Sequence, residues 1–223
     1  MRDLLPEIVI DTLRDRYIAG VSDAVATFDM NAADEDALTG ALGQAIATSR
    51  TLSSSTEKGS VHVEIGYTKL RGRGKNAPEK KFGSDGIFQI SVADSQGRII
   101  RSKGLPFQSK KEWRRSDKKL AEQAKQMEEY TLGGIVIDFS RCGYKACSAN
   151  QVIKAEGKRK NIDDMKSMRP LGQVLGDEFP ACRIGTTGLY FDRDTGLFIY
   201  QSRNFHLLTT NVFLEGDKCL TKP

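Results

Sequence analysis

Asp85, Gln108 and Lys110 supply a carboxylate, an amide oxygen and an ammonium, a set that can bind a divalent metal and cleave a phosphodiester. Hydrolysis of a phosphodiester needs a positioned water, partial neutralisation of the phosphate and help for the leaving oxygen. Magnesium held by one or two carboxylates provides all three. In this hypothesis Asp85 is the central ligand, the side-chain oxygen of Gln108 completes part of the shell, and Lys110 orients the water or stabilises negative charge.

The three residues flank or lie on two segments that the sequence predicts to form a β-hairpin. Residues 86–92 alternate apolar and polar side chains, residues 94–97 are typical of a turn, and residues 98–110 resume the extended pattern. If Gln96 and Gly97 form a two-residue loop, paired positions have numbers that sum to 193.

In that register Asp85 lies opposite Gln108, and both share one face of the hairpin with Lys110. The other face carries the apolar side chains that we expect to pack against a helix, namely Phe88, Ile90, Leu105 and Phe107. A bulge within residues 103–106 would shift the pairing by one residue.

Glu35 is the candidate for an additional metal ligand. It lies at the start of a predicted helix over residues 32–48, for which Asn31 is the expected cap. Its spacing places it on the face of the buried stripe formed by Leu38, Leu42 and Ile46. The alternative is an ordinary first-turn acid that complements the helix dipole. Glu64, on a predicted strand, and Glu79, in a basic loop, are rival acids for the same role.

The composition is that of an ordinary globular chain, with 223 residues and a net charge of +5. No apolar run approaches membrane-spanning length and the N-terminus lacks the pattern of a signal peptide, so we expect a cytoplasmic protein with no membrane partner. Neither the four cysteines nor the two histidines have the spacing of a zinc site. Cys142 and Cys147 flank a predicted turn, where buried free thiols are favoured over a disulfide.

Two clusters of basic residues flank the hairpin. Residues 69–81 contain six basic residues against one acid, and residues 98–125 contain ten against three. Such clusters neutralise phosphates and release counterions, which gives affinity for nucleic acid without sequence preference. The alternative is a solubilising surface. The candidate nucleic-acid-binding residues are Arg71, Arg73 and Lys75 in a glycine-containing loop, and Lys111, Arg114 and Arg115 after the hairpin.

The remaining pattern predicts further helices and strands around the hairpin. Helices are expected over residues 4–28, 111–130, 152–155 and 170–179, and strands over residues 61–68, 134–140, 143–149, 188–192 and 197–200. Residues 53–60 and 157–169 are expected to be connections, the second of them mobile. Trp113 is expected in the core rather than as a platform for base stacking. We expect a core over residues 1–155, with N-terminal helices, and a C-terminal extension over residues 156–223 that packs on the core or completes it.

The order of a helix acid, a strand aspartate and a Gln-x-Lys motif on the next strand resembles the PD-(D/E)xK nuclease superfamily, which includes many restriction enzymes and Holliday-junction resolvases. Within that superfamily, Gln108-Ser109-Lys110 is most similar to the Mrr-type restriction endonucleases, in which glutamine commonly replaces the second acid. The resemblance covers residues 30–150. Two departures are Ser84, where the motif has proline, and the uncharged Gln108, which lowers the expected metal affinity.

The resemblance implies an α/β fold with a mixed central sheet flanked by helices, as in restriction endonucleases. It implies a nuclease that uses Mg²⁺ or Mn²⁺ to hydrolyse DNA, with Asp85, Gln108 and Glu35 as metal ligands and Lys110 as a further catalytic residue. Double-stranded DNA is the expected substrate and prokaryotic defence against foreign DNA the expected role, in a homo-oligomer or with a regulatory domain or partner protein. Two alternatives stay open: a nucleic-acid-binding module that has lost catalysis, and a toxin-like RNase on the same scaffold.

Overall fold

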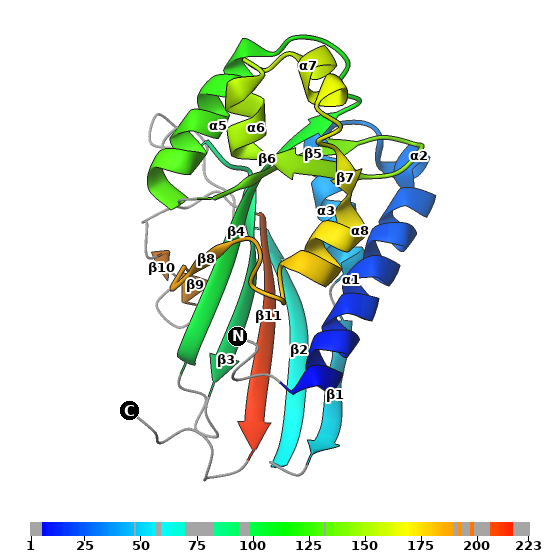
Figure 1. Ribbon diagram of the computed structural model, residues 1–223. Helices are drawn as coiled ribbons and strands as arrows, with labels where there is room; N and C mark the ends of the chain where they lie inside the picture. Colours follow the sequence, from blue (N-terminus) through cyan, green and yellow to red (C-terminus); the bar gives the residue numbers. More distant parts are fainter. Residues whose placement is uncertain are drawn as a thin grey trace.

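The computed structural model shows an α/β fold in which helices cover a mixed, mostly antiparallel sheet (Figure 1). It describes residues 6–46, 48–56, 59–69, 83–93, 99–131, 133–189, 191–192, 197–198 and 206–215. The helices are α1 (Glu7–Ala26), α2 (Phe28–Asn31), α3 (Glu35–Ile46), α5 (Lys118–Thr131), α6 (Ala149–Lys154), α7 (Arg159–Asp164) and α8 (Leu171–Gln173), which continues as a π-helical turn, η1 (Val174–Glu178). The expected α/β class with a mixed sheet is confirmed at this level.

The strands come from all parts of the chain. They are β1 (Thr48–Thr56), β2 (Gly59–Lys69), β3 (Gly86–Ala93), β4 (Ile99–Lys111), β5 (Ile135–Phe139), β6 (Lys145–Ser148), β7 (Arg169–Pro170), β8 (Thr186–Thr187), β9 (Phe191–Asp192), β10 (Leu197–Phe198) and β11 (His206–Glu215). The main sheet has the order β1-β2-β11-β3-β4-β5-β6-β7, and β8 pairs with β4. β11 runs parallel to β3 and β5 runs parallel to β4. The predicted hairpin therefore lies inside the sheet, bordered by β11 and by β5.

Helices pack on both faces of this sheet. α1 and α3 lie against the face that carries Phe88 and Phe107, whose rings stack with centroids 4.7 Å apart. α5 and α6 lie against the opposite face, which carries Val136 and Cys147. The buried stripe of α1 is Val9, Leu13, Tyr17, Val21 and Ala24, and that of α3 includes Leu38, Leu42 and Ile46, as their spacing predicts. Each large apolar side chain buried in this way contributes about 1.5–3 kcal/mol, which holds the sheet between two helical layers.

Two helix starts differ from the expectation. α5 begins at Lys118 rather than at residue 111, because β4 continues to Lys111 and Asp117 caps the helix by accepting the N–H of Leu120 at 2.9 Å. The cap of α3 is Asp34, which accepts the N–H of Ala37 at 2.7 Å. Asn31 instead lies in the short helix α2.

The strands and connections differ as well. Residues 48–56 form β1, although residues 53–60 are expected to be a polar connection, because pairing with β2 overrides their low apolar content. Residues 157–169 contain α7 and are tied to the core by Arg159, so the expectation of a mobile connection is wrong. The expected hairpin at residues 188–200 is present as β9 and β10.

Candidate active site

The β3–β4 pairing has the predicted register. Gly86 pairs with Phe107, and the same offset holds as far as Val92. The register shifts between Val92 and Ala93, close to the turn, whereas residues 103–106 pair regularly. The predicted offset is therefore confirmed for residues 86–92, whereas Asp85 precedes β3, its backbone N–H donates to Phe107, and its pairing opposite Gln108 stays a prediction.

The Asp85 carboxylate lies where β3 would otherwise continue along β4. The backbone N–H of Asp85 donates to the carbonyl oxygen of Phe107 at 2.8 Å, directly before β3 begins. Oδ2 of Asp85 accepts three hydrogen bonds from β4: from Gln108 Nε2 at 2.8 Å, from the Ser109 N–H at 2.8 Å and from Ser109 Oγ at 2.6 Å. Successive residues of a strand point to opposite faces. The carboxylate thus joins side chains from both faces at the end of β3.

Gln108 contacts this carboxylate and also has a buried acceptor atom that could bind a cation. Its side chain is 2% exposed, and its amide nitrogen donates to Asp85. Its Oε1 is buried and has no hydrogen-bond donor among the described residues. A buried acceptor left unsatisfied costs about 1–3 kcal/mol. A cation or a donor beside Oε1 would remove that cost.

Lys110 lies two residues further along β4, on the same face as Gln108. Its Nζ lies 3.3 Å from Oδ2 of Asp117, and the two side chains are 18% and 29% exposed. Oδ1 of Asp117 also caps α5. The lysine is therefore held at the junction between the end of β4 and the start of α5.

Glu35 approaches β4 from the other face. Its Oε1 accepts the backbone N–H of Lys111 at 3.3 Å, next to Thr39, whose hydroxyl lies 3.4 Å from that of Ser109. Ser109 and Lys111 point to the α3 face, and Gln108 and Lys110 to the α5 face. The contact of Glu35 is thus with the backbone of β4 on the α3 side, and its role as a metal ligand stays a prediction.

The rival acids and the first basic cluster have separate positions. Glu64 lies on β2, opposite Asn211 of β11, so that β11 separates it from β3. The remaining residues of this group, Glu79, Arg71, Arg73 and Lys75, lie outside the described residues.

The candidate residues of the second basic cluster differ in exposure and in their contacts. Lys111 is half-buried and its Nζ donates to the carbonyl oxygen of Ala32 at 2.9 Å. Arg114 is 76% exposed and pairs with Glu112 at 3.0 Å. Arg115 is exposed, and its carbonyl oxygen accepts Nε1–H of Trp113 at 2.8 Å. Arg114 and Arg115 are therefore available to a ligand at the surface, whereas the ammonium of Lys111 is engaged within the fold.

A metal fits this arrangement in one respect. The described part of the chain contains no cluster of three His, Cys, Asp or Glu side chains that suits a metal ion. Asp85 and Gln108 nevertheless place a carboxylate beside a buried amide oxygen, and Mg²⁺ in proteins is commonly held by one or two carboxylates, keeping several waters. The orphaned Oε1 of Gln108 is the atom that a cation would satisfy.

Three residues of this region were missed by the sequence reasoning. Ser109 donates twice to Asp85, and nothing in its local pattern marks it. Asp117 is recognisable, because an aspartate three residues before the first buried position of α5, Leu120, is a typical helix cap. His206 begins β11 opposite Gly86, beside the start of β3, which only the tertiary pairing reveals.

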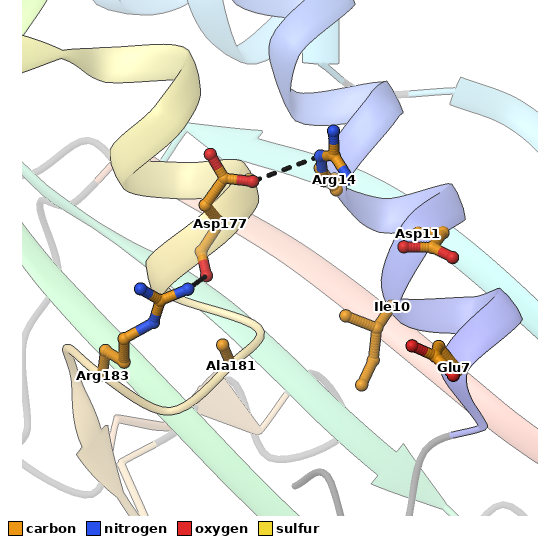
Figure 2. A pocket seen from close by; sticks show the side chains of 8 residues that line it. Glu7, Ile10, Asp11, Arg14, Asp177, Ala181 and Arg183 are labelled. Atoms are coloured by element: carbon orange, nitrogen blue, oxygen red, sulfur yellow. Dashed lines mark hydrogen bonds and ion pairs between the residues drawn. The ribbon is translucent and has the colours of Figure 1, made fainter.

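A hollow of about 420 Å³ lies elsewhere, between α1 and residues 176–183 (Figure 2). Arg14 of α1 pairs there with Asp177 at 3.2 Å, and Arg183 donates to the backbone carbonyl of Asp177 at 3.1 Å. α1 covers the sheet face opposite to Gln108 and Lys110. This hollow is therefore separate from the candidate active site.

Comparison of the chain with protein-family models, with curated proteins and with solved structures finds no match. Within the described residues, no helix has the length and apolar character needed to cross a membrane.

Proposed function

We propose that this protein is a metal-dependent nuclease that hydrolyses DNA phosphodiester bonds, with the restriction-endonuclease-like arrangement that the sequence resemblance implies. The observation that carries the proposal is the contact of the Gln108 amide with Asp85, which leaves Oε1 of Gln108 buried and without a donor among the described residues. The order of β3, β4, α5 and a parallel β5 supports it, because it agrees with the expected strand, turn, strand, helix and strand.

Each residue has a role that its position supports. Asp85 and Gln108 would hold the cation, which would neutralise the phosphate and activate a water. Ser109 fixes the Asp85 carboxylate through two hydrogen bonds, so that it keeps one orientation. Lys110, whose ammonium lies beside Asp117, would stabilise the negative charge that develops on the phosphate. Action on foreign DNA in prokaryotic defence, as a cytoplasmic enzyme, is part of this proposal through the resemblance alone.

The test is cleavage of supercoiled plasmid and of linear duplex DNA in magnesium, in manganese and in EDTA. We expect Asp85→Asn and Lys110→Met each to lower the cleavage rate by at least about a hundredfold. Lys145→Met, which removes an exposed lysine on β6, should leave the rate unchanged. Cleavage that persists in both active-site variants would contradict the proposal.

A second candidate is a nucleic-acid-binding module without catalysis. It is favoured by the three protein hydrogen bonds that Oδ2 of Asp85 already accepts, and by the ion pair of Lys110 with Asp117. This module would bind DNA in a salt-sensitive manner and cleave neither DNA nor RNA with either metal. Cleavage of RNA but not of DNA, lost in Asp85→Asn, would assign the same residues to an RNase.

A further inference from the structure

Two chain segments that lie about forty residues apart in sequence meet beside Lys110. The first, residues 112–119, joins β4 to α5, and the second, residues 154–160, joins α6 to α7. The backbone N–H of Asp117 donates to the carbonyl oxygen of Gly157 at 2.9 Å, and Ser116 forms an isolated antiparallel bridge with Lys158. α5 and α6 lie side by side in this part of the molecule, with α7 beyond them (Figure 1).

The close approach of the two segments depends on Gly157. Its φ is +69°, in the left-handed region, and a Cβ built there would lie 2.0 Å from the carbonyl oxygen of Asp117. Such a distance is far below a van der Waals contact, so another residue at this position would force the segments apart. The sequence therefore specifies their contact.

A buried network of hydrogen bonds and an ion pair around Arg159 also holds the two segments together. Arg159 donates to the carbonyl oxygen of Trp113 at 2.9 Å and also pairs with Asp138, and its guanidinium lies 5.4 Å from the centre of the Trp113 indole. Asp138 in turn accepts the backbone N–H of Trp113 at 2.9 Å. Trp113 is 6% exposed, which confirms its expected place in the core. The network thus holds the backbone of the two segments in one arrangement.

The exposed side chains of the two segments are mostly basic. Residues 112–119 and 154–160 expose seven lysine and arginine side chains against two glutamates. Each glutamate is already paired, Glu112 with Arg114 at 3.0 Å and Glu156 with Lys158 at 2.6 Å. The hydrogen bond from Lys158, together with the charges of Lys158, Lys118 and Lys125, lowers the pKa of Glu156. Lysines of both segments and of α5 therefore lie close enough to Glu156 to lower its pKa.

We propose that the exposed basic side chains of residues 112–119 and 154–160 form one preformed surface, the basic surface, that binds the phosphate backbone of a nucleic acid and leads it to Lys110. The inference rests on the proposed nuclease function and names how the substrate is held. It adds residues 154–160, which lie beyond the region of sequence resemblance, to the contacts with the substrate. A group of exposed cations on two adjoining segments suits a polyphosphate chain, because it releases counterions and needs no reading of base sequence.

The experiment measures binding of a fluorescein-labelled DNA duplex, and of an RNA duplex of the same sequence, by anisotropy in EDTA over a series of salt concentrations. Lys118→Gln and Lys158→Gln remove one charge from each segment. Since each phosphate contact contributes about 0.9 to the slope of log K against log salt, we expect each variant to reduce the slope by about 0.9 and the double variant by about 1.8. The matched control is Arg14→Gln with Arg183→Gln, which removes two charges at the hollow of Figure 2 and should leave the slope unchanged.

The outcomes separate this inference from the nuclease proposal. A slope that stays at the wild-type value in the Lys118 and Lys158 variants, or that falls equally in the control, overturns the basic surface even if Asp85→Asn abolishes cleavage. A reduced slope in a protein that cleaves nothing overturns the nuclease and supports the surface. Equal reductions with DNA and RNA support the surface as a binder of the phosphate backbone. Thermal unfolding of each variant confirms that it is folded before binding is measured.

Discussion

Replacing Gln108 with glutamate tests whether the candidate site binds a cation, because the change places a second carboxylate beside Asp85. In the wild-type protein the amide nitrogen of Gln108 donates to Oδ2 of Asp85 at 2.8 Å, within a side chain that is 2% exposed. Gln108→Glu has nearly the same shape but places a carboxylate oxygen at that position. Two carboxylates would then face each other without a donor between them.

The cost of this change follows from two competing effects. Two unit charges 2.8 Å apart repel by about 6 kcal/mol at an effective dielectric of about 20. Taking up one proton avoids the repulsion, and raising the pKa of a glutamate from about 4.3 to above 7 costs at most about 4 kcal/mol at pH 7. Protonation is the less costly course, so we expect Gln108→Glu in EDTA to lose about 3–4 kcal/mol in the free energy of unfolding.

A divalent cation should reverse most of that loss. A metal that binds the folded protein but not the unfolded chain, at about 100 times its dissociation constant, adds about 2.7 kcal/mol of stability. We therefore expect magnesium or manganese to stabilise Gln108→Glu more than the wild-type protein in urea denaturation. The matched control is Gln89→Glu, which introduces an acid at a glutamine of β3 that is 1% exposed, and which should lose stability equally with and without metal. Equal stability of Gln108→Glu and wild type in EDTA, or a loss that no metal relieves, would refute the reasoning.

Three further predictions concern groups outside the candidate site. Asp138→Asn leaves the mostly buried Arg159 without its main counter-charge, so urea denaturation should show a loss of about 3–5 kcal/mol, and a loss below 1 kcal/mol would contradict it. Burial lowers the pKa of Lys103, and Cys182 raises it in part. Between that lowered pKa and about 10.5 the unfolded chain binds more protons than the folded protein, so the free energy of unfolding of the wild-type protein should rise with pH through this window. Lys103→Met should not show this rise, and parallel pH profiles of the two proteins would contradict the prediction. Burial raises the pKa of Cys147 to about 12, so iodoacetamide should modify exposed Cys182 but not Cys147 in the folded protein, as peptide mapping can check.

The sequence predicts the two strands of the hairpin because the alternation of apolar residues identifies them, and the assumed offset gives the pairing of Gly86 with Phe107. The pair nearest the turn, Ala93 with Ile99, departs from that offset, so an irregularity that no local signal marks lies between the turn and the rest of the hairpin. The stripes of α1 and α3 are equally readable, since helical spacing determines which side chains are buried.

Features that depend on distant pairing were not predictable in this way. β11 lies between β2 and β3, although residues 206–215 carry no local sign of their neighbours. Arg159 belongs to a polar segment that reads as a mobile connection, and its role appears once Trp113 and Asp138 are brought beneath it. Glu35 shares a helix face with buried residues, as its spacing indicates, but spacing alone does not say which face of the sheet that helix covers.

The position of Asp85 at the end of β3 would allow one residue to serve both the fold and the proposed chemistry. β4 continues past the start of β3, and the Asp85 carboxylate accepts the Ser109 N–H that a further residue of β3 would otherwise have bonded. A strand that ends beside a longer neighbour leaves backbone groups unpaired, and a carboxylate satisfies them while bringing a negative charge to the same point. Loss of activity in an Asp85 variant is therefore ambiguous by itself. Ser109→Ala weakens the structural role and leaves the charge in place, so the two contributions separate when the stability and the cleavage rate of both variants are compared.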